Sequence, residues 1–181
     1  MTKFNNKPNE SITHKGETRW LSRSLAVVVT VILNREKVLI VKRGQNMTQA
    51  SKWCNPCGYL DWNESGTQCA IREVWEETGL DLSKIIDENP EKVSFESMFN
   101  PWDIVTNPTL NHNQDVALYY GICINSEEEP EIHNKNCEEG EIDEVKWVKF
   151  DELKDYDFAY NHDKRIIKYS TYVNDDLQNK L

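Results

Sequence analysis

The segment 58–80 constrains this chain most, because it places three glutamates at helical spacing directly after a glycine-containing turn. Glu73, Glu76 and Glu77 stand at i, i+3 and i+4, so a helix puts all three on one face. The spacing predicts a helix over about 66–78 with these glutamates facing solvent. Three carboxylates on one stripe repel each other, whereas Mg²⁺ or Mn²⁺ neutralises such a cluster and prefers oxygen ligands. The segment therefore predicts a metal-binding helix face.

The other side of the same helix is expected to pack on the rest of the protein. Ile71, Val74, Trp75 and Thr78 fall on the arc opposite the glutamates, which predicts that these four side chains are buried. Gly79 stands where a C′ residue ends a helix. The sequence thus predicts an amphipathic helix with a defined end.

The full pattern of fixed residues is more specific than the glutamates alone. Gly58 is followed after five residues by Glu64 and after seven more by the run Arg72-Glu-Val-Trp-Glu-Glu-Thr-Gly-Leu80. This pattern resembles the complete Nudix box, and a chance match at average residue usage is on the order of one in a million. Glutamates at this spacing otherwise indicate an acidic surface that only pairs with Arg72. The complete box favours a metal site.

The resemblance to Nudix proteins implies a fold and roles for the box residues. The fold is α+β, with a mixed β-sheet between helices in an α/β/α sandwich. Glu76 and Glu77 would be the main metal ligands, and the carbonyl of Gly58 would be a further oxygen ligand. Glu73 would be a ligand or the general base. The implied catalytic set is Glu73, Glu76 and Glu77, with Mg²⁺ or Mn²⁺ as the cofactor.

Two further groups of residues complete the implied site. Arg72 would be structural, tying its guanidinium to a carboxylate such as Glu64, although Glu64 could equally be an acid favoured near a helix start. In Nudix enzymes an acid from a downstream loop often reaches the metal, while the acidic segment 127–144 could also be a plain solvated loop. Four candidates in this segment stay open: Glu138, Glu139, Glu141 and Glu144.

Residues near the box could contact substrate. Lys42, Arg43 and Lys52 could meet substrate phosphates, and the alternative is that they are ordinary surface cations. Tyr59 could stack on a base or pack in the core.

Cys54 and Cys57 form a C-x-x-C pair that has no second half for a closed zinc site. Buried thiols are the more frequent outcome. The segment 53–58 is similar to the W-x-x-P-G-G of many Nudix hydrolases, with Cys57 in place of the first glycine. It is also similar to the surroundings of the nucleophilic cysteine in isopentenyl-diphosphate isomerase, but the histidine expected after that cysteine is absent.

Elsewhere the pattern predicts one domain over 19–181 behind a flexible arm over 1–18, with a long loop over 100–114. The expected elements are strands over 24–33, 38–43, 93–99, 116–124 and 145–150 and a final amphipathic helix over 161–178.

Charge and composition limit the partners. A net charge of −10 argues against nucleic acid as a sequence-independent partner. The longest apolar run, 25–33, is too short to span a membrane. Five cysteines without a signal peptide pattern predict reduced thiols in a cytoplasm.

The leading prediction is a metal-dependent hydrolase that cleaves a phosphoanhydride in a nucleoside diphosphate linked to another group. A nucleotide sugar, a dinucleotide and a nucleoside triphosphate all fit, and a homodimer is compatible with the sequence. A Nudix domain that senses a nucleotide without cleaving it is the alternative, and the isomerase is the less favoured third interpretation.

Overall fold

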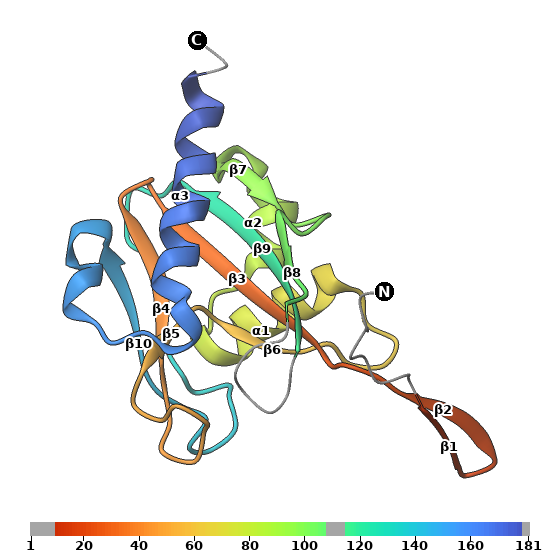
Figure 1. Ribbon diagram of the computed structural model, residues 1–181. Coiled ribbons are helices and arrows are strands. Elements are labelled where there is room, and N and C mark those ends of the chain that lie inside the picture. The colour runs from red at the N-terminus through yellow and green to blue at the C-terminus, as the bar shows by residue number, and fades with distance from the viewer. Residues whose placement is uncertain (1–9, 108–114, 179–181) are drawn as a thin grey trace, which may run out of the picture.

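A mixed eight-stranded sheet forms the centre of the protein, in a computed structural model that describes residues 10–107 and 115–178 (Figure 1). The strands are β1 Glu10–His14, β2 Glu17–Leu21, β3 Leu25–Leu33, β4 Lys37–Arg43, β5 Trp53–Cys54, β6 Cys57–Tyr59, β7 Val93–Ser97, β8 Asp103–Val105, β9 Val116–Ile124 and β10 Ile142–Lys149. The α-helices are α1 Gly66–Thr78, α2 Leu82–Glu88 and α3 His162–Gln178, and short 3₁₀ turns span Pro90–Lys92, Phe150–Asp155 and Ala159–Asn161.

The central strand is β3, as its nearly continuous β-branched and apolar sequence predicts. It pairs in parallel with β9 along its whole length, and the remaining pairs in this sheet are antiparallel. The order along the sheet is β10-β4-β3-β9-β7, with β8 also on the edge of β9. The expected strands over 24–33 and 116–124 are therefore confirmed.

The strands β3 and β4 separate soon after their turn. Their direct pairing is limited to Ile32 with Val38 and Leu33 with Lys37. The segment 53–59 fills the gap, because β5 pairs with β4 and β6 pairs with β3. This arrangement brings the start of the box into the sheet itself.

Helices cover both faces of the sheet. Side chains of β3 alternate between them: Val29 and Val31 pack with Val74 of α1, while Ile32 packs with Tyr169 of α3. The two faces have separate apolar cores, and Figure 1 shows α3 crossing one face while α1 lies behind the other. The α+β class and the α/β/α sandwich are confirmed.

Some expected loops contain strands. Residues 10–21, within and next to the expected loose arm, form the hairpin of β1 and β2, which stands as a separate two-stranded sheet. The expected long loop over 100–114 contains β8, which pairs with β9, and residues 108–114 lie outside the described part. Among the helices of the described residues, none has the length and apolar character needed to cross a membrane.

Candidate active site

The box helix begins and ends as local sequence signals require. The side chain of Ser65 accepts a hydrogen bond from the Gln68 N–H, and the Ser65 N–H in turn donates to Gln68 Oε1, which makes a capping box. Gly79 ends the helix in the left-handed conformation at φ 71°. The predicted span and the predicted end are confirmed.

The glutamate stripe is less exposed than the sequence predicts. Glu73 and Glu77 are 6% and 2% exposed, and they point into the protein beside the buried Val74. Trp75, expected in the core, is 46% exposed. Both expectations were wrong for one reason: the helix turns Glu73 and Glu77 toward β6, so Trp75, about 200° round the helix from each of them, faces outward.

A glycine in β6 makes room for one of these carboxylates. A Cβ built on Gly58 would stand closer than 3.0 Å to both carboxylate oxygens of Glu73. On the preceding residue, the N–H of Cys57 donates to Glu77 Oε2 at 3.1 Å. Adjacent residues of one strand therefore fix both buried glutamates.

Arg72 joins the acids around the helix. Its guanidinium donates to Glu64 at 2.8 and 3.0 Å, to Glu73 at 2.6 Å and to Glu76 at 2.9 Å. It also donates to the carbonyl of Tyr59 at 3.1 Å, so it ties the loop before the helix to the glutamate face. The contact with Glu64 is the one that the resemblance implied.

Burial perturbs the acids at this face. Burial raises the pKa of Glu73 to about 7, although the adjacent Arg72 guanidinium opposes that shift. Burial likewise raises the pKa of Glu77 well above its usual range. The charge of Glu141 raises the pKa of both residues further.

Of the four downstream acids, Glu141 is the one whose charge acts on both buried glutamates. Glu144 instead pairs with Lys146 at 2.8 Å, and Glu138 and Glu139 are exposed. The different settings of these four acids depend on how the segment before β10 folds back, which no local pattern encodes, and which of them reaches a metal stays a prediction.

The carboxylate oxygens at this face suit a hard cation, but they are not arranged around a common point as metal ligands are. Within residues 10–107 and 115–178, His, Cys, Asp and Glu side chains form no group of three at metal-binding distance. One reason is visible: Arg72 Nη1 holds both Glu73 and Glu76. The oxygen ligands are present, and a divalent cation would relieve the repulsion among the buried carboxylates.

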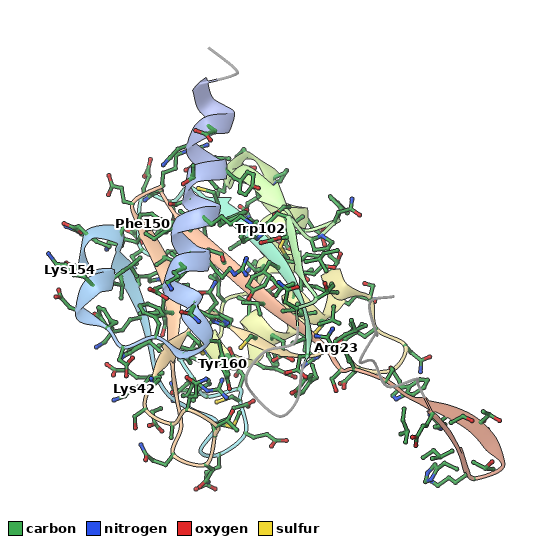
Figure 2. All side chains as sticks on the ribbon, in the orientation of Figure 1. Arg23, Lys42, Trp102, Phe150, Lys154 and Tyr160 are labelled. Atoms are coloured by element: carbon green, nitrogen blue, oxygen red, sulfur yellow. The ribbon has the colours of Figure 1, made fainter. Side chains whose placement is uncertain are left out.

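The residues expected to meet substrate lie in different settings. Arg43 is buried at 6% exposure, donates to the Thr48 carbonyl at 2.7 Å and lies over the ring of Tyr160, labelled in Figure 2 before α3. Lys52 pairs with Asp157 at 3.3 Å. Their roles toward substrate stay predictions.

The other two expected substrate contacts lie on the sheet. Lys42 is half-buried on β4, where Trp53 and Glu144 are its neighbours in register. Tyr59 is half-exposed, and its hydroxyl donates to Asp115 Oδ2 at 3.2 Å. Whether either residue meets substrate also stays a prediction.

Two buried hydrogen bonds of Asn55 hold the strand segment next to the box, and the sequence pattern does not indicate them. The N–H of Asn55 donates to His162 Nδ1 at 3.1 Å, and Asn55 Nδ2 donates to Thr30 Oγ1 at 2.7 Å. Both contacts join residues far apart in the chain, so sequence spacing carries no signal for them.

Known proteins match this chain in sequence. The family model described as NUDIX domain matches residues 23–169. The mRNA-decapping enzyme subunit 2 of Saccharomyces cerevisiae is 27% identical over 120 residues, covering 66% of this chain and 10% of the relative. The chain thus spans about a tenth of the length of that relative. Nudix hydrolase 25 of Arabidopsis thaliana is 26% identical over 155 residues, covering 80% of this chain and 85% of the relative.

Solved structures have the same fold. A bifunctional NMN adenylyltransferase/ADP ribose pyrophosphatase from Francisella tularensis has a TM-score of 0.68 at 20% identity, covering 84% of this chain and 42% of that one. A hydrolase of the NUDIX family from Clostridium perfringens has a TM-score of 0.55 at 26% identity, covering 87% and 99%. With the family model matching most of the chain, this protein belongs to the NUDIX domain family.

Proposed function

We propose that this protein is a metal-dependent hydrolase that cleaves a phosphoanhydride bond in a nucleoside diphosphate linked to another group. The observation that carries the proposal is the placement of Glu73 and Glu77, which are buried on one face of α1 against β6. The charge of Glu141 adds to the rise in the pKa of both residues. The single guanidinium of Arg72 is shared by Glu64, Glu73 and Glu76, and Glu77 accepts from the Cys57 N–H. These carboxylates outnumber that cation, which suits a site that binds a further cation.

The ligands of the metal would come from the box and from the downstream loop. Glu76, Glu77, the Gly58 carbonyl and Glu141 would hold Mg²⁺ or Mn²⁺. A bound divalent cation neutralises charge on phosphate oxygens and lowers the pKa of a bound water. In this arrangement Arg72 orients Glu76, since its Nη1 donates to Glu76 Oε2 at 2.9 Å.

Glu73 suits the role of general base, with the role of ligand as the alternative. A carboxylate whose pKa is about 7 can accept a proton from water near neutral pH. Gly58 leaves the space that its carboxylate occupies, and Arg72 fixes the orientation of that carboxylate at 2.6 Å.

The chemistry of the site and the names of the relatives support the proposed substrate class. Oxygens of a bridging diphosphate chelate Mg²⁺ in pairs, which suits a carboxylate cluster. A relative from Danio rerio, 30% identical over 109 residues, is named m7GpppN-mRNA hydrolase NUDT17. Capped RNA therefore joins nucleotide sugars, dinucleotides and nucleoside triphosphates as a candidate, although the charge of −10 still predicts weak binding to an RNA backbone.

The test is phosphate release from these compounds with Mg²⁺ and with Mn²⁺, in water enriched in ¹⁸O. We expect cleavage of at least one diphosphate-bridged compound, loss of activity with chelator, and ¹⁸O at phosphorus in one product. Nucleoside monophosphates should resist. Brisk hydrolysis of monoesters without action on any bridged compound would contradict the proposal. Binding of a nucleotide without turnover would favour the sensing alternative.

A further inference from the structure

Two thiols lie together where the segment 53–59 enters the sheet. Cys54 on β5 belongs to a buried apolar cluster with Val41 and Ile142, and Cys57 on β6 packs against the same cluster. The Cys57 thiol also forms a hydrogen bond with Cys54. Both cysteines are free; Cys54 is buried, whereas Cys57 is partly exposed. The pair therefore consists of one thiol that a small molecule can reach from solvent and a second, buried thiol in contact with it.

A buried cation adjoins the inner thiol. Arg43 Nη1 donates to Cys54 Sγ at 3.9 Å, and Arg43 is 6% exposed. The Arg43 side chain is fixed in this place, because its Nε donates to the Thr48 carbonyl at 2.7 Å. A cation beside a cysteine promotes the attack of its sulfur on a disulfide. Cys54 is therefore well placed to attack a disulfide formed at Cys57.

The outer cysteine is linked to the glutamate face through its backbone. The Cys57 N–H donates to Glu77 Oε2 at 3.1 Å. The two residues between the cysteines are held elsewhere: Asn55 makes two buried hydrogen bonds, and the Pro56 carbonyl accepts from the Val29 N–H at 2.9 Å. A disulfide brings its two sulfurs to about 2.05 Å. With residues 55 and 56 fixed, that movement acts on Cys57 and so on the group that holds the Glu77 carboxylate.

We propose that Cys54 and Cys57 form a reversible disulfide, a redox switch that weakens the metal site by drawing the Cys57 N–H away from Glu77. The reduced protein is the active form. Formation of the disulfide is independent of the proposed function, whereas its effect on metal binding and turnover rests on that function. A disulfide that a pool of small thiols can form and break again responds to the redox state of that pool.

The oxidant is a small-molecule disulfide of the glutathione class. Cys57 loses its proton to solvent and its sulfur attacks one sulfur of the oxidant, whose S–S bond breaks to release a thiolate that takes up a proton. Cys54 then loses its proton to solvent and attacks Cys57 Sγ in the mixed disulfide, releasing a second thiolate that is protonated in turn. Two protein thiols thus lose two electrons and two protons, and one oxidant disulfide becomes two thiols.

The first experiment detects the bond in the intact protein. The protein is treated with oxidised glutathione at pH 8, where thiols attack disulfides faster than at neutral pH, and the remaining thiols are alkylated. Trypsin then releases the peptide 53–72, which carries Cys54, Cys57 and Cys69. Mass spectrometry should find this peptide lighter by two hydrogens, with fragment ions that place the bond between Cys54 and Cys57. Reduced glutathione should reverse the change.

The second experiment compares the two redox forms after removal of glutathione. Electron paramagnetic resonance of free Mn²⁺ should show that the oxidised protein binds Mn²⁺ roughly 10-fold more weakly, as loss of a group that orients a metal ligand commonly does. Turnover should fall with it, and reduction should restore both. Cys57→Ser should show no change on treatment. The matched control is Cys137→Ser, which removes another partly exposed thiol, a donor to the Asn134 carbonyl at 3.1 Å, and should respond as the wild type does.

The outcomes separate this proposal from the proposed function. No bond between Cys54 and Cys57 in the treated wild type, or a bond of either cysteine to Cys69 or Cys137 instead, would overturn the switch. A disulfide that leaves Mn²⁺ affinity and turnover unchanged would overturn it as well, while the proposed function would still stand on the reduced protein. A reduced protein that binds no Mn²⁺ and cleaves nothing would overturn the proposed function and the switch with it.

Discussion

The carboxylate of Glu73 fills the space beside Gly58 in which any side chain at position 58 would have to begin. The helix and the strand can therefore approach closely at this point, and the buried carboxylate depends on a missing side chain as much as on its own helix.

Gly58→Ala should displace the Glu73 carboxylate. We expect a loss in kcat of roughly 10- to 100-fold, because small misplacements at reacting groups are costly, and a loss in stability of about 1–3 kcal/mol from overpacking. Steady-state kinetics and thermal melts measure the two effects. Gly16→Ala, in the β1–β2 hairpin with no neighbour near its new Cβ, should leave kcat unchanged. Full activity of Gly58→Ala would show that the position of Glu73 is not critical.

Glu77→Gln should lower kcat by at least roughly 10²-fold, since it removes a carboxylate from the proposed ligand set. Without metal the variant should be at least as stable as the wild type at pH 7, because burial raises the pKa of Glu77 and its charged form destabilises the fold. Thermal melts with and without Mn²⁺ should show that the metal raises the melting temperature less in the variant than in the wild type. Glu88→Gln, exposed on α2, is the control. Near-normal turnover in a folded Glu77→Gln would refute the metal assignment.

Cys57→Ser should retain most of the activity. The hydrogen bond with Cys54 and burial raise the pKa of the Cys57 thiol well above its usual range, so the reactive thiolate is scarce at neutral pH. Kinetics of Cys57→Ser beside Cys54→Ser test this expectation. Loss of turnover in Cys57→Ser, together with conversion of isopentenyl diphosphate by the wild type, would instead support the isomerase alternative.

His162 should make the protein less stable in mild acid. Burial lowers its pKa to about 3, below the usual 6.5, so the unfolded chain binds a proton more readily than the folded one. The free energy of unfolding is therefore unaffected by His162 well above pH 6.5 and decreases as the pH falls from there toward 3. The decrease reaches about 1 kcal/mol at pH 5.5.

His162→Asn keeps an acceptor for the Asn55 N–H and should flatten this dependence. Urea unfolding of both proteins from pH 7.5 to 5 measures the difference. The raised pKa of Glu73 acts in the opposite direction, favouring the fold as the pH falls, but it is present in both proteins and cancels. Parallel curves for the two proteins would contradict the assignment to His162.

Local signals were enough to predict much of the fold. The span of α1 follows from glutamate spacing and from Gly79, and β3 and β9 follow from β-branched runs. The exposure of Trp75 could not be predicted, because which arc of a helix is buried depends on what lies opposite it. Here Gly58 lies opposite Glu73 and the Cys57 N–H meets Glu77, so two glutamates of a stripe that looks polar in sequence are buried.

Sequence reasoning could not separate the four downstream glutamates for a similar reason. Four glutamates of the same segment are chemically alike, and what distinguishes Glu141 is the bond from Gly44, about a hundred residues away in the chain. The predicted substrate contacts of Lys42 and Lys52 have the same difficulty, since a basic residue near a site in sequence need not face it.

The insertion of segment 53–59 between β3 and β4 also limits which insertions and deletions the protein can accept during evolution. In β6, Cys57 pairs with Val28 and packs near Cys54 and Ile142, whereas Gly58 pairs with Val27 and lies against Glu73 of α1. Adding one residue between Trp53 and Gly58 would move Cys57 into the register position of Gly58, beside Glu73, and deleting one would move Tyr59 there. Changes of length between Trp53 and Gly58 should therefore be rejected.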